Sequence, residues 1–259
     1  MTHHGAVAIL TYHSLDNSSS VLSTAPLLFA KHMHLLYEQQ VSVLSLSEVG
    51  QLTREAVLPP FSVVITFDDG FESVYEYAMP VLLQYGFPAT IFLVTDYCNK
   101  TNAWPSQPQH VTRRPLLSWS AIKEMSGAGV TFGSHTRTHP DLRHVSKHQE
   151  IEEIVGSKKA LEDVIGRSVE TFAYPYGVWR KSTKQLVQEH FRLACTTTPN
   201  FVTAASDSFA LERLDMYYLR HPVFLRRLFS LEMRMYLALR RMGRTIRHHV
   251  SVWGSNHSP

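Results

Sequence analysis

Three short polar segments in this sequence follow apolar runs and carry side chains that can do chemistry. They are Thr66–Gly70 (TFDDG), Ser134–Asp141 (SHTRTHPD) and Phe172–Gly177 (FAYPYG). Taken singly, each has an ordinary explanation, because Asp and Gly favour turns and a histidine pair four residues apart arises by chance. In α/β folds, however, catalytic groups gather at the C-terminal ends of strands, so the three segments are expected to meet at one edge.

Taken together, the three segments predict a catalytic metal site. Two histidines and one carboxylate supply three nitrogen and oxygen ligands and leave coordination positions open for water and substrate. The adjacent pair Asp68 and Asp69 can divide the work, one binding the metal while the other takes a proton from water. Gly70 lets the backbone turn sharply after the pair. Cys98 and Cys195 stand far apart, so neither a thiolate zinc site nor a disulfide framework is expected.

The elements that must position these groups alternate between strand-length apolar runs and helix-length amphipathic stretches, which is the α/β pattern. Expected strands are Ala6–Thr11, Val41–Ser45, Phe61–Phe67, Ala89–Thr95, Val130–Ser134, Thr171–Tyr174 and Arg192–Thr196. Expected helices are Pro26–Gln40, Ser47–Arg54, Phe71–Tyr85, Ser118–Gly127, Lys147–Ile165 and Lys181–His190. This series leaves two architectures, an open doubly wound sheet or a closed barrel. The first strand is not followed by GxGxxG and the chain has no GxxxxGK[ST], which argues against a dinucleotide or P-loop fold.

Length and composition indicate a globular chain of one large domain or two small ones. Of its 259 residues 44% are hydrophobic and 18% charged, which argues against disorder, collagen and coiled coil. No run approaches the roughly 20 apolar residues that span a bilayer, and the N-terminus lacks a basic signal-peptide start, so we expect a cytoplasmic protein. The longest irregular stretch, Asp96–Leu117, would form a loop at the mouth of a barrel. Trp104, Trp119 and Trp179 are either aromatic platforms that stack on a ligand or core residues.

The C-terminal segment is strongly basic. Residues 220–259 contain eight arginines and one acidic residue, giving +7, and the rest of the chain therefore carries −4. Apolar residues at helical spacing predict a basic amphipathic helix over residues 222–249. One possibility is that this helix binds an anionic surface, either a partner protein or the inner face of a membrane. The other is that it packs on the barrel itself. Because the remainder is acidic and has no recognition fold, nucleic acid is not an expected partner.

In this order, the three polar segments resemble those of the NodB-homology polysaccharide deacetylases, carbohydrate esterase family 4, over residues 6 to about 218. The resemblance implies that Asp68 is the catalytic base and that Asp69, His135 and His139 bind the metal. It also implies that the backbone N–H of Tyr176 contributes to an oxyanion hole.

Two departures from the common family pattern favour one branch of it. Phe172 and Ala173 stand where many members carry Arg, and no Leu-x-His motif closes the domain. Both features resemble the circularly permuted poly-N-acetylglucosamine deacetylases of exopolysaccharide systems. That branch implies His13, after the first strand, as general acid, and Arg213, in the segment ALERLD, as the residue that orients the base. The alternative for His13 is a purely structural role, and the alternative for Arg213 is a surface ion pair.

The resemblance implies a distorted (β/α) barrel of about seven parallel strands, formed by residues 1–219, with residues 220–259 as a basic helix and tail. The implied activity is metal-dependent removal of acetyl groups from N-acetylated sugars of a polysaccharide or lipid-linked glycan. Zinc is the default ion, with cobalt, nickel and iron as alternatives. A catalytically silent carbohydrate-binding relative and a deacylase of a non-sugar amide are the alternative functions.

Overall fold

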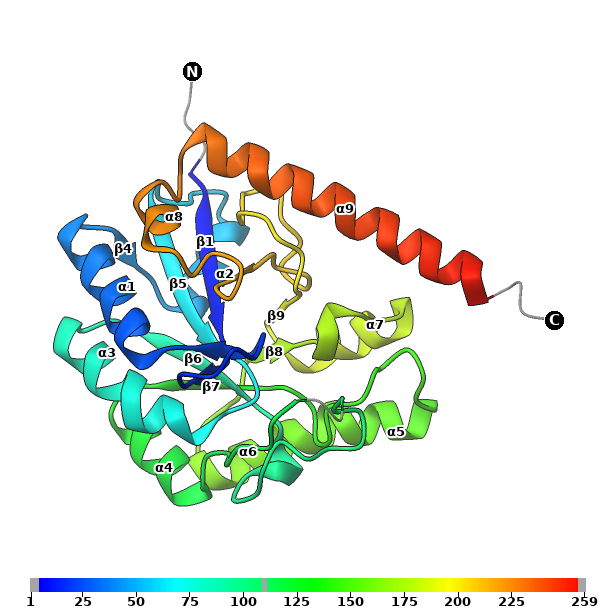
Figure 1. Cartoon of the computed structure of the whole chain (residues 1–259). Coiled ribbons are helices and arrows are strands. Elements are labelled where there is room, and N and C mark those ends of the chain that lie inside the picture. Colours follow the sequence, from blue (N-terminus) through cyan, green and yellow to red (C-terminus); the bar gives the residue numbers. More distant parts are fainter. Residues whose placement is uncertain (1–4, 109–110, 256–259) are drawn as a thin grey trace.

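Parallel strands form the centre of the molecule and helices surround them (Figure 1). The computed structural model describes residues 5–108 and 111–255, with side chains described as far as Gly243. The main sheet runs in the order β10-β1-β5-β6-β7-β8-β9, and β4 pairs with β5 beside this path. Its strands are β1 (Val7–Tyr12), β4 (Ser42–Val43), β5 (Ser62–Phe67), β6 (Ala89–Leu93), β7 (Thr131–Ser134), β8 (Thr171–Ala173), β9 (Leu193–Cys195) and β10 (Leu214–Asp215). A small separate sheet pairs β2 (Ser14–Leu15) with β3 (Ser23–Thr24).

The segment that contains β10 closes the sheet into a distorted barrel. Leu211 forms a parallel bridge with Cys195 of β9, and three residues later Leu214 pairs with Leu10 of β1. The predicted barrel is therefore confirmed, and each of the seven expected strands is present. Strand β10 was not expected, because two residues inside a polar segment show no hydrophobic periodicity.

The helices follow the predicted positions. They are α1 (Pro26–Glu38), α2 (Leu46–Arg54), α3 (Met79–Tyr85), α4 (Trp119–Gly127), α5 (Lys147–Ile151), α6 (Ser157–Ile165), α7 (Lys181–His190), α8 (Pro222–Arg226) and α9 (Leu231–Ser255). Side-chain oxygens of Ser45, Ser118 and Ser146 accept from the third backbone N–H of α2, α4 and α5, which marks where these helices begin. Single π-helical turns, Val74–Ala78 and Glu152–Gly156, precede α3 and join α5 to α6.

Alternation along the strands separates two cores. In β1, Ala8 and Leu10 belong to the large core that contains residues of the surrounding helices, whereas Val7 and Ile9 belong to a second, smaller core. The smaller core also contains residues of β5, β6, β8 and β9 and is therefore the barrel interior. Since successive side chains of a strand point to opposite faces, every second residue at a strand end points into the mouth of the barrel.

The C-terminal segment differs from the continuous helix predicted over residues 222–249. It is broken by a turn over residues 227–230, after which the Ser230 hydroxyl accepts from Met233 N and begins α9. Leu225, Leu228 and Leu237 are buried in the large core, so this segment packs on the barrel before α9 extends away from it (Figure 1). Within the described part of the chain, no helix combines the length and hydropathy needed to cross a membrane.

Candidate functional site

Strand register brings several of the candidate side chains to one end of the barrel. His13, Asp68 and His135 follow β1, β5 and β7 directly, at the inward positions of the alternation. Arg213 directly precedes β10, two residues after Leu211 of the interior core. Thr11 and Thr66 stand two residues before His13 and Asp68, and their hydroxyl oxygens lie 3.1 Å apart. Strands β1 and β5 therefore present His13 and Asp68 to the same place.

Asp69, His135 and His139 converge on one point. Asp69 Oδ1 lies 3.7 Å from His135 Nε2 and 3.6 Å from His139 Nε2, and all three side chains are buried. His135 Nδ1 lies 2.7 Å from the Ala173 carbonyl oxygen, which can only accept. His135 Nδ1 must therefore carry the proton, and its Nε2 presents a lone pair toward the carboxylate, as metal-binding histidines do.

The electrostatics of this group fit a divalent cation. Burial, aided by the nearby His135, lowers the pKa of His139 well below its ordinary value, so the imidazole is neutral and can act as a ligand. Burial raises the pKa of Asp69, since the carboxylate loses its hydration, a cost that a cation would offset. Two imidazoles and one carboxylate make a donor set that suits zinc and other first-row divalent ions.

The backbone is strained where it supplies these groups. Asp69, His139 and Tyr176 have φ of +69°, +56° and +59°, in the left-handed region that residues with a Cβ seldom adopt. Gly70 follows at φ +76°, where a Cβ would lie 2.3 Å from Leu93 Cδ2. Such strain concentrates at functional sites, because surrounding contacts must hold it in place.

Asp68, the neighbour of Asp69, pairs with Arg213. The Arg213 guanidinium donates from Nη1 and Nη2 to the two carboxylate oxygens of Asp68, at 2.7 Å each, and from Nε to Thr196 O at 2.9 Å. Arg213 is only 1% exposed, so the alternative of a surface ion pair is wrong. Burial opposes the charge on Asp68, but Arg213 and His135 outweigh it and hold the pKa of Asp68 below its ordinary range.

His13 lies on the open side of Asp68. Its Nε2 is 4.0 Å from Asp68 Oδ2, and the side chain keeps 18% of its surface exposed, so it is neither a core residue nor free in solvent. Asp215, paired with Thr11 across β1 and β10, is close enough to His13 for the two charges to interact. Burial nevertheless raises the pKa of Asp215 overall.

Tyr176 lies beside the histidines on the short turn Pro175–Gly177. Its ring meets the ring of His139 edge to face at 4.7 Å, and its hydroxyl donates to Ser106 Oγ at 2.9 Å. These contacts hold the Tyr176 side chain, and the turn that carries it, beside the candidate metal ligand His139.

Sequence reasoning did not identify Ser106 as a site residue, and it named Trp104 only as a stacking platform or a core residue. Trp104 stacks on His139 with centroids 4.8 Å apart, and Ser106 Oγ donates to His139 O at 2.6 Å. Trp104 is buried, so it supports His139 and is not a surface platform for sugars. The one sequence feature that could have identified Trp104 and Ser106 is their position in the Asp96–Leu117 stretch, which was expected to lie at the barrel mouth.

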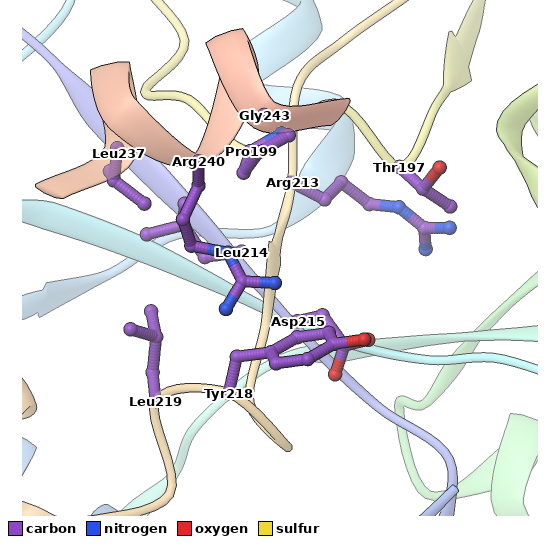
Figure 2. Close-up of a pocket in the computed structure, with 10 residues that line it drawn as sticks. All are labelled: Thr197, Pro199, Arg213, Leu214, Asp215, Tyr218, Leu219, Leu237, Arg240 and Gly243. Atoms are coloured by element: carbon purple, nitrogen blue, oxygen red, sulfur yellow. The ribbon is translucent and has the colours of Figure 1, made fainter. Parts of the chain in front are cut away.

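A cavity of about 610 Å³ adjoins the Asp68–Arg213 pair. It lies between α9 and the segment that contains β10, and Arg213 and Asp215 are among its lining residues. Figure 2 shows Arg240 of α9 reaching toward Tyr218, with the guanidinium carbon 3.7 Å from the centre of the ring. Of the residues described above, Arg213 and Asp215 line the cavity, which therefore lies next to the site on the side covered by α9.

The chain is similar to known proteins in sequence. Residues 56–191 match the polysaccharide deacetylase family, a range that includes Asp68, Asp69, His135, His139 and Tyr176 but neither His13 nor Arg213. YxkH of Bacillus subtilis is 28% identical over 208 residues, 80% of this chain and 70% of that protein. The poly-β-1,6-N-acetyl-D-glucosamine N-deacetylase of Staphylococcus aureus is 30% identical over 161 residues, and the match spans 58% of this chain and about half (52%) of that protein.

Solved structures show the same architecture. The Streptococcus pyogenes deacetylase PplD, in complex with acetate, superimposes with a TM-score of 0.75 at 26% identity, covering 86% of this chain and 98% of that one. IcaB from Ammonifex degensii shares the fold, with a TM-score of 0.70 at 23% identity over 86% of this chain and 95% of that one. With its barrel and more than half of its length matched, the chain belongs to the polysaccharide deacetylase family.

Proposed function

We propose that this protein is a metal-dependent N-deacetylase that acts on N-acetylated sugars of a polysaccharide or lipid-linked glycan. The observation that carries the proposal is the convergence of Asp69, His135 and His139 beside a separate, ionised Asp68 held by Arg213. The Staphylococcus aureus relative, named for poly-β-1,6-N-acetyl-D-glucosamine, supports an exopolysaccharide as the substrate class.

Asp69, His135 and His139 would hold the cation, and zinc is the ion we expect first. When bound, a divalent cation polarises the acetamide carbonyl and makes water a stronger nucleophile at neutral pH. His135 is kept in the required tautomer by the Ala173 carbonyl, and Trp104 and Ser106 hold His139 in place.

The remaining residues move and stabilise charge. Asp68, ionised at neutral pH, accepts a proton from the attacking water, and Arg213 orients its carboxylate. The Tyr176 backbone N–H donates to the oxygen that gains negative charge as water adds to the carbonyl carbon. His13, on the open side of Asp68, donates a proton to the sugar nitrogen as the C–N bond breaks. The products are acetate and a free amino sugar.

The cavity beside Arg213 and Asp215 would receive the part of the glycan next to the reacting unit. Its volume lies in the range typical of small-molecule sites, and Tyr218 and Arg240 offer an aromatic edge and a hydrogen-bond donor. A longer glycan would then bind more tightly than a single sugar.

The two alternative functions predict different chemistry. A catalytically silent carbohydrate-binding relative would need neither the Asp68–Arg213 pair nor a complete set of metal ligands, and this chain has both. A non-sugar amide would use the same machinery without needing the adjoining cavity.

Acetate release tests the proposal directly. The purified protein, loaded separately with zinc, cobalt or nickel, is incubated with β-1,6-linked N-acetylglucosamine oligomers, chitin oligomers, an N-acetylated lipid-linked sugar and a simple acetanilide. We expect release from at least one glycan and loss of release in Asp68→Asn. Release from the acetanilide alone would favour the non-sugar amide, and no release with any metal would favour the silent relative.

A further inference from the structure

Helix α9 has two apolar faces, and only one of them is used by the fold. Met233 and Leu237 are buried in the large core. Leu231, Met235, Leu239 and Met242 are 60–70% exposed. At about 100° per residue, these four side chains fall within an arc of about 80° that lies opposite the buried pair. The exposed arc, which we call the outer stripe, therefore has no packing role in the described chain.

The outer stripe is continuous along the helix. Its members follow one another at intervals of four, four and three residues, and the sequence places Ile246, Val250 and Trp253 at the same spacing further along α9. No charged residue occupies any of these seven positions. Isolated exposed apolar residues are normal on protein surfaces, whereas a contiguous stripe on a single helix indicates a surface that something covers.

Charge identifies the kind of surface that would cover it. Arg234 and Arg241 come directly before Met235 and Met242, and the segment over residues 220–259 carries +7 while the rest of the chain carries −4. A second copy of this helix would bring one +7 segment against another, which is unfavourable. A bilayer with anionic headgroups attracts the helix and repels the acidic barrel, so it also orients the molecule.

We propose that the outer stripe of α9 lies in the interface of a membrane that contains anionic phospholipids, with the helix parallel to its plane. The C-terminal half of α9 extends beyond the barrel (Figure 1), and the four described members of the stripe are exposed in its N-terminal half. Leu237 and Arg240 of the same helix line the cavity beside Arg213. Both residues lie on the opposite side of the helix from the outer stripe, so docking would leave that cavity on the side of α9 that faces away from the bilayer.

Vesicle flotation with the full-length protein tests this interaction. The variant Leu231→Ser/Met235→Ser/Leu239→Ser/Met242→Ser removes the outer stripe, and Leu27→Ser/Val57→Ser/Leu83→Ser changes exposed apolar residues elsewhere on the surface. We expect the wild type and the control to bind phosphatidylglycerol-containing vesicles at least about tenfold more tightly than pure phosphatidylcholine vesicles. The four-serine variant should lose at least about tenfold in affinity, and salt should weaken wild-type binding.

Several outcomes would overturn the proposal. The first is that the wild type does not bind vesicles, and the second is that the four-serine variant binds them as tightly as the wild type. The third is that light scattering shows a wild-type dimer that is lost in the four-serine variant, which would assign the stripe to a second copy of the chain. Since all four side chains are exposed, melting temperatures should agree within about 3 °C. If they do not, Met235→Asp alone provides the comparison.

Discussion

At the mouth of the barrel, both carboxylate oxygens of Asp68 accept hydrogen bonds from Arg213, which is 145 residues further along the chain. A buried ion pair of this kind persists only with good geometry on both sides, because each ion has lost its hydration. Here the Thr196 carbonyl accepts from the remaining guanidinium edge. The pair keeps a carboxylate ionised where burial alone would protonate it.

Arg213→Gln should move the acidic limb of the kcat/KM profile to higher pH. The base must be ionised to act, and without the guanidinium, burial raises the pKa of Asp68, so activity is lost at a higher pH than in the wild type. We expect a displacement of about 1–3 pH units, measured by acetate release across pH. Arg192→Gln, which breaks an exposed ion pair with Glu170, serves as the control. An acidic limb at the same pH as in the wild type would mean that Arg213 does not keep the pKa of Asp68 low.

Asp68→Asn and Asp69→Asn should separate turnover from metal content. The first removes the proton acceptor without removing a ligand, so activity should fall by about 10²–10⁴ with metal content near wild type. The second should reduce metal content itself. Elemental analysis of both variants distinguishes them, and His144→Gln at an exposed position is the control. Loss of metal in Asp68→Asn would mean that the two aspartates are reversed.

His13→Ala should reduce kcat by about 10²–10⁴ without changing metal content, because the sugar nitrogen would leave without its proton. His34→Ala, at a half-exposed position on α1, should leave the rate unchanged. Near-normal turnover in His13→Ala would assign the proton transfer to another group.

Tyr218→Ala should raise KM for glycan oligomers more than for a single N-acetylated sugar, with kcat little changed. The ring lines the adjoining cavity and supports the Arg240 guanidinium, while the reacting groups lie outside it. Initial-rate measurements with a monomer and with oligomers of increasing length provide the test. An equal rise in KM for all substrates would mean that the cavity does not bind the neighbouring sugars.

The fold should lose stability as the pH falls from about 6.5 to about 4, in part through His32. This buried side chain accepts from the Tyr12 hydroxyl, donates to Arg220 O, and has its pKa lowered by burial to about 4. Because the unfolded chain takes up the proton first, the free energy of unfolding declines through that interval, by up to about 3 kcal/mol. Urea unfolding at several pH values should show a shallower decline in His32→Gln than in the wild type or in His34→Gln. Equal slopes in all three would contradict this origin.

The residue types of the site, and the elements that carry several of them, can be predicted from local sequence. Asp68, Asp69 and His135 come directly after long apolar runs, and such runs form strands wherever they pack, so the position of these residues at strand ends is local information. Seven of the strands and most helix boundaries are predictable for the same reason.

The contacts across the barrel could not be predicted in this way, because they depend on how the whole chain folds. Arg213 reaches Asp68 because strand β10, two residues long, inserts between β1 and β9, and nothing in so short a polar segment specifies its neighbours. Trp104 stacks on His139 through an irregular loop whose path has no periodicity. The two faces of α9 likewise emerge only when one of them packs on the core. Hydrophobic patterning specifies which face of an element is buried, whereas contact partners depend on strand order and loop path, which involve the whole chain.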